Sequence, residues 1–196
     1  MKKIVFLDRD GVINRNPKYL DYIKKPSEFR FLPGAEKGIR MLNDAGFEIF
    51  VISNQSGVSK GLFSAKDLKD IDRKMVRGLK KRGAKIRKSY YCIHPAEANC
   101  ECKKPKTGML KKAAKNIRPD RKNSFFVGDT ERDIIAGRDF GVKTIAVCSG
   151  YYNRKQMKKW KTRPDFIKED LLSAAGLILT RSAHIYDKKK AAGRIR

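Results

Sequence analysis

The chain has 196 residues, 40% of them hydrophobic, and its 47 lysines and arginines against 21 acidic residues give a formal net charge of +26. A chain of this length predicts one domain that buries a sizeable core. No apolar run approaches the length of a membrane span, and the segment before the first predicted strand is too short for a signal peptide. We therefore expect a cytoplasmic protein with no membrane partner.

The strong positive charge attracts polyanions and phosphorylated ligands. A surface rich in solvated lysines explains the same composition, and we prefer this interpretation because a sequence does not show whether basic residues share one face. A nucleic-acid partner stays open as an interpretation that we do not favour.

A short run of β-branched and aromatic residues, 3–7, predicts a buried strand that leads into Asp8, Arg9, Asp10 and Gly11. In an extended chain, residues two apart direct their side chains to the same side, so Asp8 and Asp10 are expected to face one way. Two neighbouring carboxylates need a cation or a shared proton. On its own, Asp-x-Asp-Gly also describes an ordinary polar turn.

The remaining elements alternate along the chain. A polar loop or small flap is expected over residues 15–30. Further strands are predicted at 47–52, 88–93, 124–127 and 143–147, with a short extended segment at 165–167, and helices at 35–45, 64–83, 107–116, 131–140 and 171–179. This alternation predicts an α/β fold: one Rossmann-like domain with a parallel sheet, helices on both faces and no large cap. We expect the domain to cover residues 1–180 and a loosely docked basic tail to cover 181–196.

Polar side chains follow three of the predicted strands. Because the carboxyl ends of parallel strands meet at one edge of a sheet, Asp8, Asp10, Ser53 and Asp129 are expected to converge there. Lys104 precedes a helix and is able to join them. Carboxylates at two strand ends suit Mg²⁺, and a hydroxyl with a lysine suits a phosphoryl group.

Three of the four cysteines lie within eleven residues, together with a histidine. The spacing Cys92-x-His94-x5-Cys100-x-Cys102 offers three thiolates and an imidazole, which suits a closed, tetrahedral zinc site. We expect a small zinc loop over residues 92–102 with a structural role. Cys148 stands apart from this group and is expected to be a packed thiol.

Four motifs in order resemble those of the haloacid dehalogenase superfamily. They are Asp8-Arg9-Asp10-Gly11-Val12, Ser53-Asn54-Gln55, Lys104 and Gly128-Asp129-x-x-x-Asp133. With the Cys/His loop placed just before Lys104, the chain resembles the zinc-bearing branch of that superfamily. That branch contains D,D-heptose 1,7-bisphosphate phosphatases and histidinol-phosphate phosphatases, and the resemblance covers about residues 3–180.

This resemblance implies a Mg²⁺-dependent phosphatase that works through an aspartyl-phosphate. Asp8 is the implied nucleophile, and Asp10 is implied to protonate the leaving oxygen and then to activate water. Asp8, the backbone carbonyl of Asp10 and Asp129 are implied to hold Mg²⁺. Ser53 and Lys104 are implied to stabilise the transferring phosphoryl group.

Other residues receive supporting roles by the same resemblance. Asp133 is implied to orient Lys104 or a metal-bound water. The residues implied to contact substrate are Asn16, Pro17, Lys18, Tyr19, Asn54, Gln55, Ser56 and Lys103.

Different segments of the sequence indicate different substrates. Most of the matching segments look like the heptose enzymes, so we expect a sugar bisphosphate. The short spacer between His94 and Cys100 looks instead like the histidinol-phosphate branch, and Lys103 stands where the family carries an arginine. A polynucleotide 3′-phosphatase, which shares part of the motif set, and a nucleic-acid-binding module also stay open as functions. We expect the protein to be a monomer.

Overall fold

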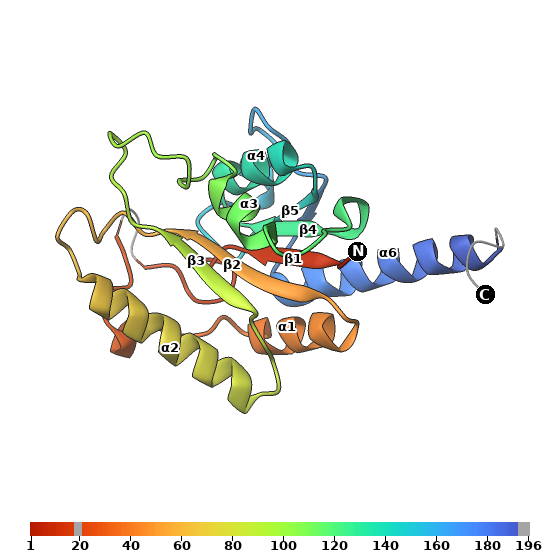
Figure 1. The fold of residues 1–196 in the computed structure, drawn as a ribbon, viewed down its shortest axis with the longest axis horizontal. Coiled ribbons are helices and arrows are strands. Elements are labelled where there is room, and N and C mark those ends of the chain that lie inside the picture. Colours follow the sequence, from red (N-terminus) through yellow and green to blue (C-terminus); the bar gives the residue numbers. More distant parts are fainter. Residues whose placement is uncertain (18–20, 192–196) are drawn as a thin grey trace.

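The computed structural model describes the backbone of residues 1–17 and 21–191 and the side chains of residues 1–17 and 21–182. Its centre is a parallel sheet of six strands in the order β3-β2-β1-β4-β5-β6 (Figure 1). The strands are β1 (Ile4–Leu7), β2 (Glu48–Asn54), β3 (Lys88–Cys92), β4 (Phe125–Gly128), β5 (Lys143–Val147) and β6 (Phe166–Lys168).

The first five helices connect consecutive strands, and the sixth follows the last strand. They are α1 (Ala35–Asp44), α2 (Ala65–Lys81), α3 (Gly108–Ala114), α4 (Glu131–Phe140), α5 (Arg154–Met157) and α6 (Leu171–Ala191), with 3₁₀ turns at Pro26–Glu28 and Arg121–Asn123. Ser64 caps α2 through the predicted box with Asp67, and Gly141 ends α4 in the left-handed conformation.

Both faces of the sheet are covered, because alternate residues of β1 enter different hydrophobic cores. Val5 and Leu7 pack with buried residues of α1, α2 and α6, whereas Ile4 and Phe6 pack with those of α3 and α4. Figure 1 shows α3 and α4 on one side of the sheet and α1 and α2 on the other. The predicted α/β fold with a two-sided parallel sheet is therefore confirmed.

The register of the sheet aligns the strand ends. Leu7, the last residue of β1, pairs with Val51 of β2 and Val127 of β4. The residues that follow these strands therefore meet at one edge. That edge holds the candidate site.

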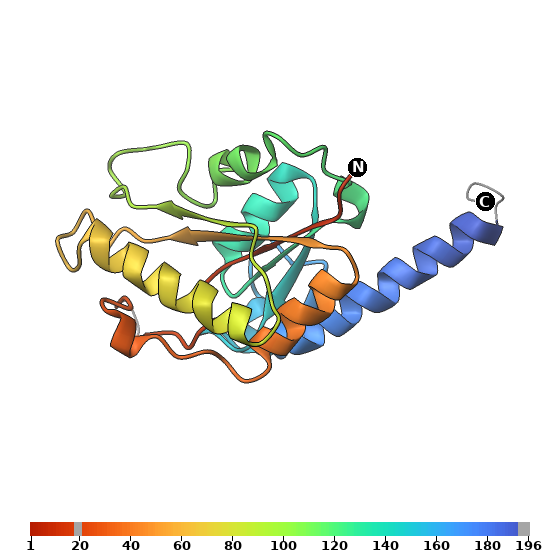
Figure 2. The same ribbon diagram turned by 60° about the horizontal axis from the view of Figure 1, so that its bottom comes forward.

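Three differences from the sequence prediction concern the C-terminal third. The short helix α5 (Arg154–Met157) was not predicted. The segment at 165–167 joins the sheet as a sixth strand by pairing with β5. Helix α6 extends to Ala191, twelve residues beyond the predicted end, and projects past the sheet (Figures 1 and 2). No glycine or proline interrupts residues 177–191, so nothing local ends the helix at 179. The expected tail over 181–196 thus begins inside a helix.

In the part of the chain that the structure describes, no helix is long and apolar enough to cross a membrane.

Candidate active site

The first loop of the sheet turns sharply after Asp8. The backbone N–H of Asp8 donates to the carbonyl of Val127 at 3.0 Å, which extends the β1–β4 pairing by one residue. Gly11 then adopts a φ of +78°, and its N–H donates to the carbonyl of Asn14 at 2.8 Å. Because glycine takes this left-handed conformation without strain, the chain reverses while Asp8 and Asp10 both stay at the sheet edge.

A cavity of about 800 Å³ opens at this edge. Its polar lining includes most of the residues that the sequence singled out. The predicted residues that line it are Asp8, Asp10, Asn16, Pro17, Ser53, Asn54, Ser56, Lys103, Lys104 and Asp129.

Lys104 is buried among acceptors. Its Nζ lies 3.0 Å from Asp8 Oδ1 and 2.6 Å from Asp133 Oδ1, and it donates to the carbonyl of Ile52 at 2.8 Å. Burial alone would lower the pKa of Lys104, but Asp133 and Asp8 outweigh it and raise the pKa, so the ammonium stays charged. Asn54 fixes the backbone of Lys104 through two 3.0 Å hydrogen bonds, one to its carbonyl and one from its N–H.

Asp8, Asp129 and Asp133 each offer a carboxylate oxygen, and these atoms lie within 4.8 Å of one another. Burial raises the pKa of Asp8 to about 6, and burial with the charge of Asp8 raises the pKa of Asp129 well above its ordinary value. Both shifts show that the positive charge nearby does not fully stabilise the two ionised carboxylates, and a divalent cation would supply the missing charge. The donor set therefore fits Mg²⁺.

Asp133 is already engaged by protein groups. Its Oδ2 accepts from the N–H of Thr130 at 3.0 Å and from the Thr130 hydroxyl at 2.7 Å, which caps α4. Its Oδ1 faces Lys104. Asp133 therefore contacts Lys104 directly, and Asp8 and Asp129 are the carboxylates with fewer protein partners.

Two glycines make room around Asp129. A Cβ at Gly11 would lie 2.3 Å from Asp129 Oδ2, and a Cβ at Gly150 would lie 2.0 Å from the same oxygen. No side chain fits at either position. The backbone therefore encloses this carboxylate from two loops.

Asp10 has different surroundings from Asp8. Arg9 donates to both of its oxygens, at 3.1 and 2.9 Å, while Asn14 and Gln55 donate at 2.8 and 2.9 Å. Burial by itself would raise the pKa of Asp10, but the Arg9 guanidinium and these hydrogen bonds lower it. Asp10 is thus held as a carboxylate before substrate arrives.

One of the described substrate contacts that were predicted, Gln55, does not line the cavity. Gln55 is fully buried behind Asp10, because its amide donates to Asp10 and to Ser53 Oγ. Lys18 and Tyr19 lie outside the described residues.

Sequence reasoning missed Arg9 and Asn14. Both are fully buried and both donate to Asp10. For Arg9 a signal was present, since strand alternation directs it away from Asp8 and Asp10, and a charged side chain on the core side of a strand requires a carboxylate partner.

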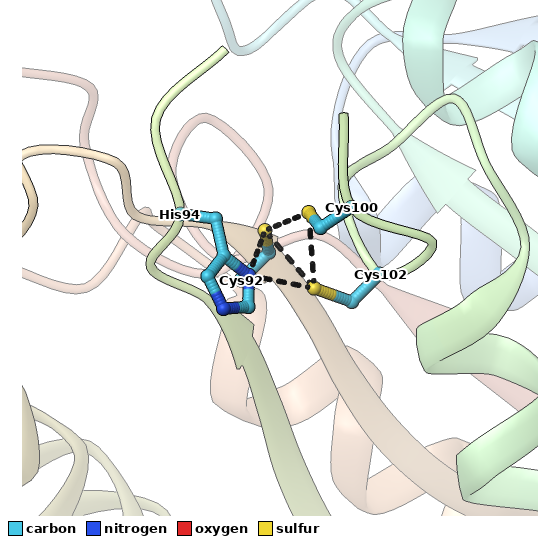
Figure 3. A group of neighbouring side chains, drawn as sticks. All are labelled: Cys92, His94, Cys100 and Cys102. Atoms are coloured by element: carbon cyan, nitrogen blue, oxygen red, sulfur yellow. Dashed lines mark hydrogen bonds between the residues drawn. The ribbon is translucent and has the colours of Figure 1, made fainter. Parts of the chain in front are cut away.

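The predicted zinc ligands come together in one group. Figure 3 shows the three thiols and the imidazole pointing toward one another. The Sγ atoms of Cys92, Cys100 and Cys102 are 3.3–3.6 Å apart, and Nδ1 of His94 lies 3.1 Å from Cys102 Sγ. All four donor atoms lie within 4.8 Å, as tetrahedral Zn²⁺ coordination requires.

The chemistry of these donors also fits zinc. Burial and the neighbouring thiols raise the pKa of Cys92 to about 12 and also raise that of Cys102. Burial alone would raise the pKa of Cys100 too, but hydrogen bonds with Cys102, Cys92 and the backbone lower it to about 6, so only one of the three thiols ionises readily. Three thiolates therefore do not coexist here without a cation. Zn²⁺ supplies that charge, and a Cys₃His set leaves no open coordination position.

The Cys/His loop lines the cavity with Pro95, Ala96 and Glu97, and Lys103 lines it directly after the loop. Nζ of Lys103 donates to Ser56 Oγ at 2.5 Å and to the His94 carbonyl at 3.3 Å, and Ser56 Oγ donates to the same carbonyl at 2.8 Å. The loop thereby fixes one cationic wall of the cavity.

Comparisons with known proteins agree with this geometry. A family model described as HAD-hydrolase-like matches residues 101–174. The chain is 36% identical over 157 residues to the D-glycero-beta-D-manno-heptose-1,7-bisphosphate 7-phosphatase of Pasteurella multocida, which covers 76% of this chain and 84% of that protein. It is 33% identical over 190 residues to the D-glycero-D-manno-heptose-1,7-bisphosphate 7-phosphatase of Chlorobaculum tepidum, with 90% and 94% covered.

A solved structure is similar over nearly its whole length. The crystal structure of D,D-heptose 1,7-bisphosphate phosphatase from B. bronchiseptica, complexed with magnesium and phosphate, superposes with a TM-score of 0.84 at 32% identity. It covers 91% of this chain and 99% of that one.

Proposed function

The chain belongs to the family of heptose 1,7-bisphosphate 7-phosphatases among the haloacid dehalogenase-like hydrolases, and from this membership we propose that it removes the 7-phosphate of a D-glycero-D-manno-heptose 1,7-bisphosphate. The observation that carries the proposal is the cavity, where Asp8, Asp10, Ser53 and Lys104 line one pocket with Asp129. The relatives carry both the alpha and the beta designation, so the proposal covers either anomer.

In this mechanism a carboxylate oxygen of Asp8 attacks phosphorus, and the bond from phosphorus to the sugar oxygen breaks. Asp10 gives its proton to that oxygen as the alcohol leaves. The pKa of Asp10 is lowered in the free protein, and an approaching anionic phosphate favours its protonated form. Asp10 then takes a proton from water, the water attacks phosphorus, and Asp8 is released with inorganic phosphate.

Charged and polar groups would stabilise the transferring phosphoryl group. Lys104, held 3.0 Å from Asp8, is aimed at the point of attack, and Ser53 offers a hydroxyl to the same cavity. Asp8 and Asp129, with the backbone carbonyl of Asp10, would hold Mg²⁺. When bound, the cation offsets the repulsion between an anionic nucleophile and an anionic phosphate.

The rest of the cavity would bind the sugar and its second phosphate. Asn16 and Ser56 present polar groups, and Lys103, Lys60 and Arg132 add positive charge to a lining that also includes Asp21 and Glu97. A substrate that carries a phosphate at each end suits such a wall. The relatives favour this substrate over histidinol phosphate, which only the short His94–Cys100 spacer suggested.

We propose that residues 1–180 form the phosphatase domain and that 181–196 are a basic segment outside it. We also propose that the protein is a monomer and that it is located in the cytoplasm. Light scattering during size exclusion measures the first of these two expectations.

One experiment tests the function directly. Mg²⁺-dependent phosphate release is compared on heptose 1,7-bisphosphate, histidinol phosphate and a 3′-phosphorylated oligonucleotide. We expect kcat/KM to be largest for the heptose bisphosphate. A larger value for either of the other two substrates would contradict the proposal.

A further inference from the structure

Arg9 is a buried cation in the middle of the first motif. Its side chain is 0% exposed, although Asp8 and Asp10 on either side of it line the cavity. Nε of Arg9 donates to Asp10 Oδ1 at 3.1 Å, and Nη2 donates to Asp10 Oδ2 at 2.9 Å. Because a guanidinium keeps its charge and a buried charge requires a partner, this bidentate pair with Asp10 is a strong constraint on both side chains.

The guanidinium also lies near an aromatic ring of the sheet. Its central carbon lies 5.8 Å from the centroid of the Tyr91 ring, on strand β3. The Tyr91 hydroxyl in turn donates to Asp72 Oδ1 on helix α2, at 2.7 Å. Arg9 is therefore fixed against the body of the protein, and Asp10 is fixed against Arg9.

Four N–H donors together hold the Asp10 carboxylate. Oδ1 accepts from Arg9 and from Asn14 at 2.8 Å, and Oδ2 accepts from Arg9 and from Gln55 at 2.9 Å. Two donors on each oxygen set the rotation of the carboxylate plane as well as its place. Arg9 supplies half of them.

We propose that Arg9 is a positioning residue, whose bidentate pair with Asp10 aims that carboxyl group at the oxygen of the leaving group. Arg9 does not line the cavity, so it acts through Asp10 and does not touch substrate. The inference rests on the proposed function in one respect, namely that Asp10 exchanges a proton with the leaving oxygen.

The leaving group separates this role from a purely structural one. A sugar alcohol needs a proton as its bond to phosphorus breaks, and general acid catalysis supplies about 10²–10⁴-fold of such a rate. The 4-nitrophenolate anion is stable and leaves without a proton. A misplaced Asp10 therefore slows the first step for an alkyl phosphate and spares it for 4-nitrophenyl phosphate, whereas a general loss of structure slows both.

The test compares Arg9→Lys with the unaltered enzyme in single-turnover experiments with Mg²⁺. Lysine keeps the charge and loses the planar fork. We expect the rate of alcohol release from heptose 1,7-bisphosphate to fall about 10²-fold and the rate of 4-nitrophenolate release to change less than about threefold. An equal fall for both leaving groups, or an unchanged rate with the sugar phosphate, overturns the proposal.

Failure of the proposed function would appear separately, as absent turnover of the heptose bisphosphate by the unaltered enzyme. The Arg9 comparison then proceeds with fructose 1,6-bisphosphate against 4-nitrophenyl phosphate, because it needs only an alkyl and an aryl leaving group.

A matched control and a second variant complete the design. Arg87→Lys alters an exposed arginine that pairs with Glu48 at 3.1 Å, and we expect both rates to stay within about twofold. If Arg9→Lys does not fold, Asn14→Ala removes one donor to Asp10 and leaves the guanidinium in place. For Asn14→Ala we expect release of the sugar alcohol to fall about tenfold and release of 4-nitrophenolate to change little. An equal loss for both leaving groups overturns the proposal there too.

Discussion

Two groups of side chains in this protein offer donor atoms suited to a cation. They differ in whether they leave coordination positions open for substrate. The Cys/His group draws its four ligands from residues 92–102, and these suffice for a tetrahedral ion. The carboxylate group draws Asp8 and Asp129 from two different strand ends and opens onto a cavity. The first is complete without substrate, and the second is not.

The electrostatics of the two groups follow the same division. The carboxylates lie beside Lys104, which offsets part of their charge, yet the pKa values of Asp8 and Asp129 remain raised by burial. The three clustered thiols instead face one another and the His94 imidazole. A cation bound by the thiols would stabilise the fold, whereas a cation bound by the carboxylates would take part in catalysis.

The largest expected effect comes from the open group, which is the carboxylate group of Asp8 and Asp129. Asp8→Asn removes the proposed nucleophile, so we expect Mg²⁺-dependent phosphate release to fall on the order of 10⁵-fold or more. Asp139→Asn, an exposed carboxylate on α4, serves as the control and should leave the rate unchanged. Undiminished turnover by Asp8→Asn would refute the nucleophile assignment.

The closed group is the Cys/His group, and the loss of one of its ligands should instead lower the stability of the protein. We expect about one zinc atom per chain by elemental analysis, and we expect Cys100→Ser to lose it. The free energy of unfolding should drop by several kcal/mol, because structural Zn²⁺ contributes about 10 kcal/mol or more in small zinc-binding domains. Cys148→Ser, which alters a thiol outside the group, should keep the zinc and nearly all of the stability. A folded, metal-free protein as purified would contradict this prediction.

The pH dependence of stability should report the open group. The pKa of Asp8 is raised from 3.8 to about 6 in the folded protein, so the native state keeps a proton that the unfolded chain has lost. Without Mg²⁺, the stability should therefore fall as the pH rises from about 4 to about 6. Thermal unfolding across this range measures the slope, with Mg²⁺ expected to flatten it.

Asp8→Asn is the control for this slope, since it removes the titrating group and should reduce the dependence. A metal-free protein that gained stability over the same pH range would have the opposite sign and would exclude the assignment.

The smallest effect should appear where the two groups meet. Lys103 directly follows the Cys/His loop and lines the cavity, so Lys103→Ala should raise KM about tenfold with little change in kcat, as the loss of one charged hydrogen bond predicts. Lys103→Arg should keep most of the affinity. Lys106→Ala is a matched control three residues further along the chain, because Lys106 pairs with Glu101 and does not line the cavity. Equal KM values for the two alanine variants would show that Lys103 does not contact substrate.

Much of the fold was predictable because its signals are local. Helix α4 and strand β5 have the predicted bounds, since Gly141 separates a helical period from a run of apolar strand residues. The end of α6 was not predictable from its composition, because a basic sequence without glycine or proline suits both a helix and a loose tail.

The candidate site was predictable only in part, for a geometric reason. Asp8 and Asp129 directly follow β1 and β4, and Ser53 is the second-last residue of β2, so the parallel sheet alone brings them together. The partners of Asp10 were harder to assign. Strand alternation indicates that Arg9 points to the buried side, but it does not show which carboxylate Arg9 pairs with, and no motif spacing shows that Gln55 turns toward Asp10. Gln55 was therefore assigned to substrate when its amide faces Asp10.

The strand order has a consequence for dividing the chain. Strand β1 lies between β2 and β4, so the boundary between β1 and β4 separates strands from the first half of the sequence from those of the second. A chain cut after the Cys/His loop would leave Asp8 and the zinc ligands on one fragment and Asp129 with Gly150 on the other. Neither fragment would hold both carboxylates. Recovered phosphatase activity on mixing the two would then measure the reassociation of the sheet at its centre.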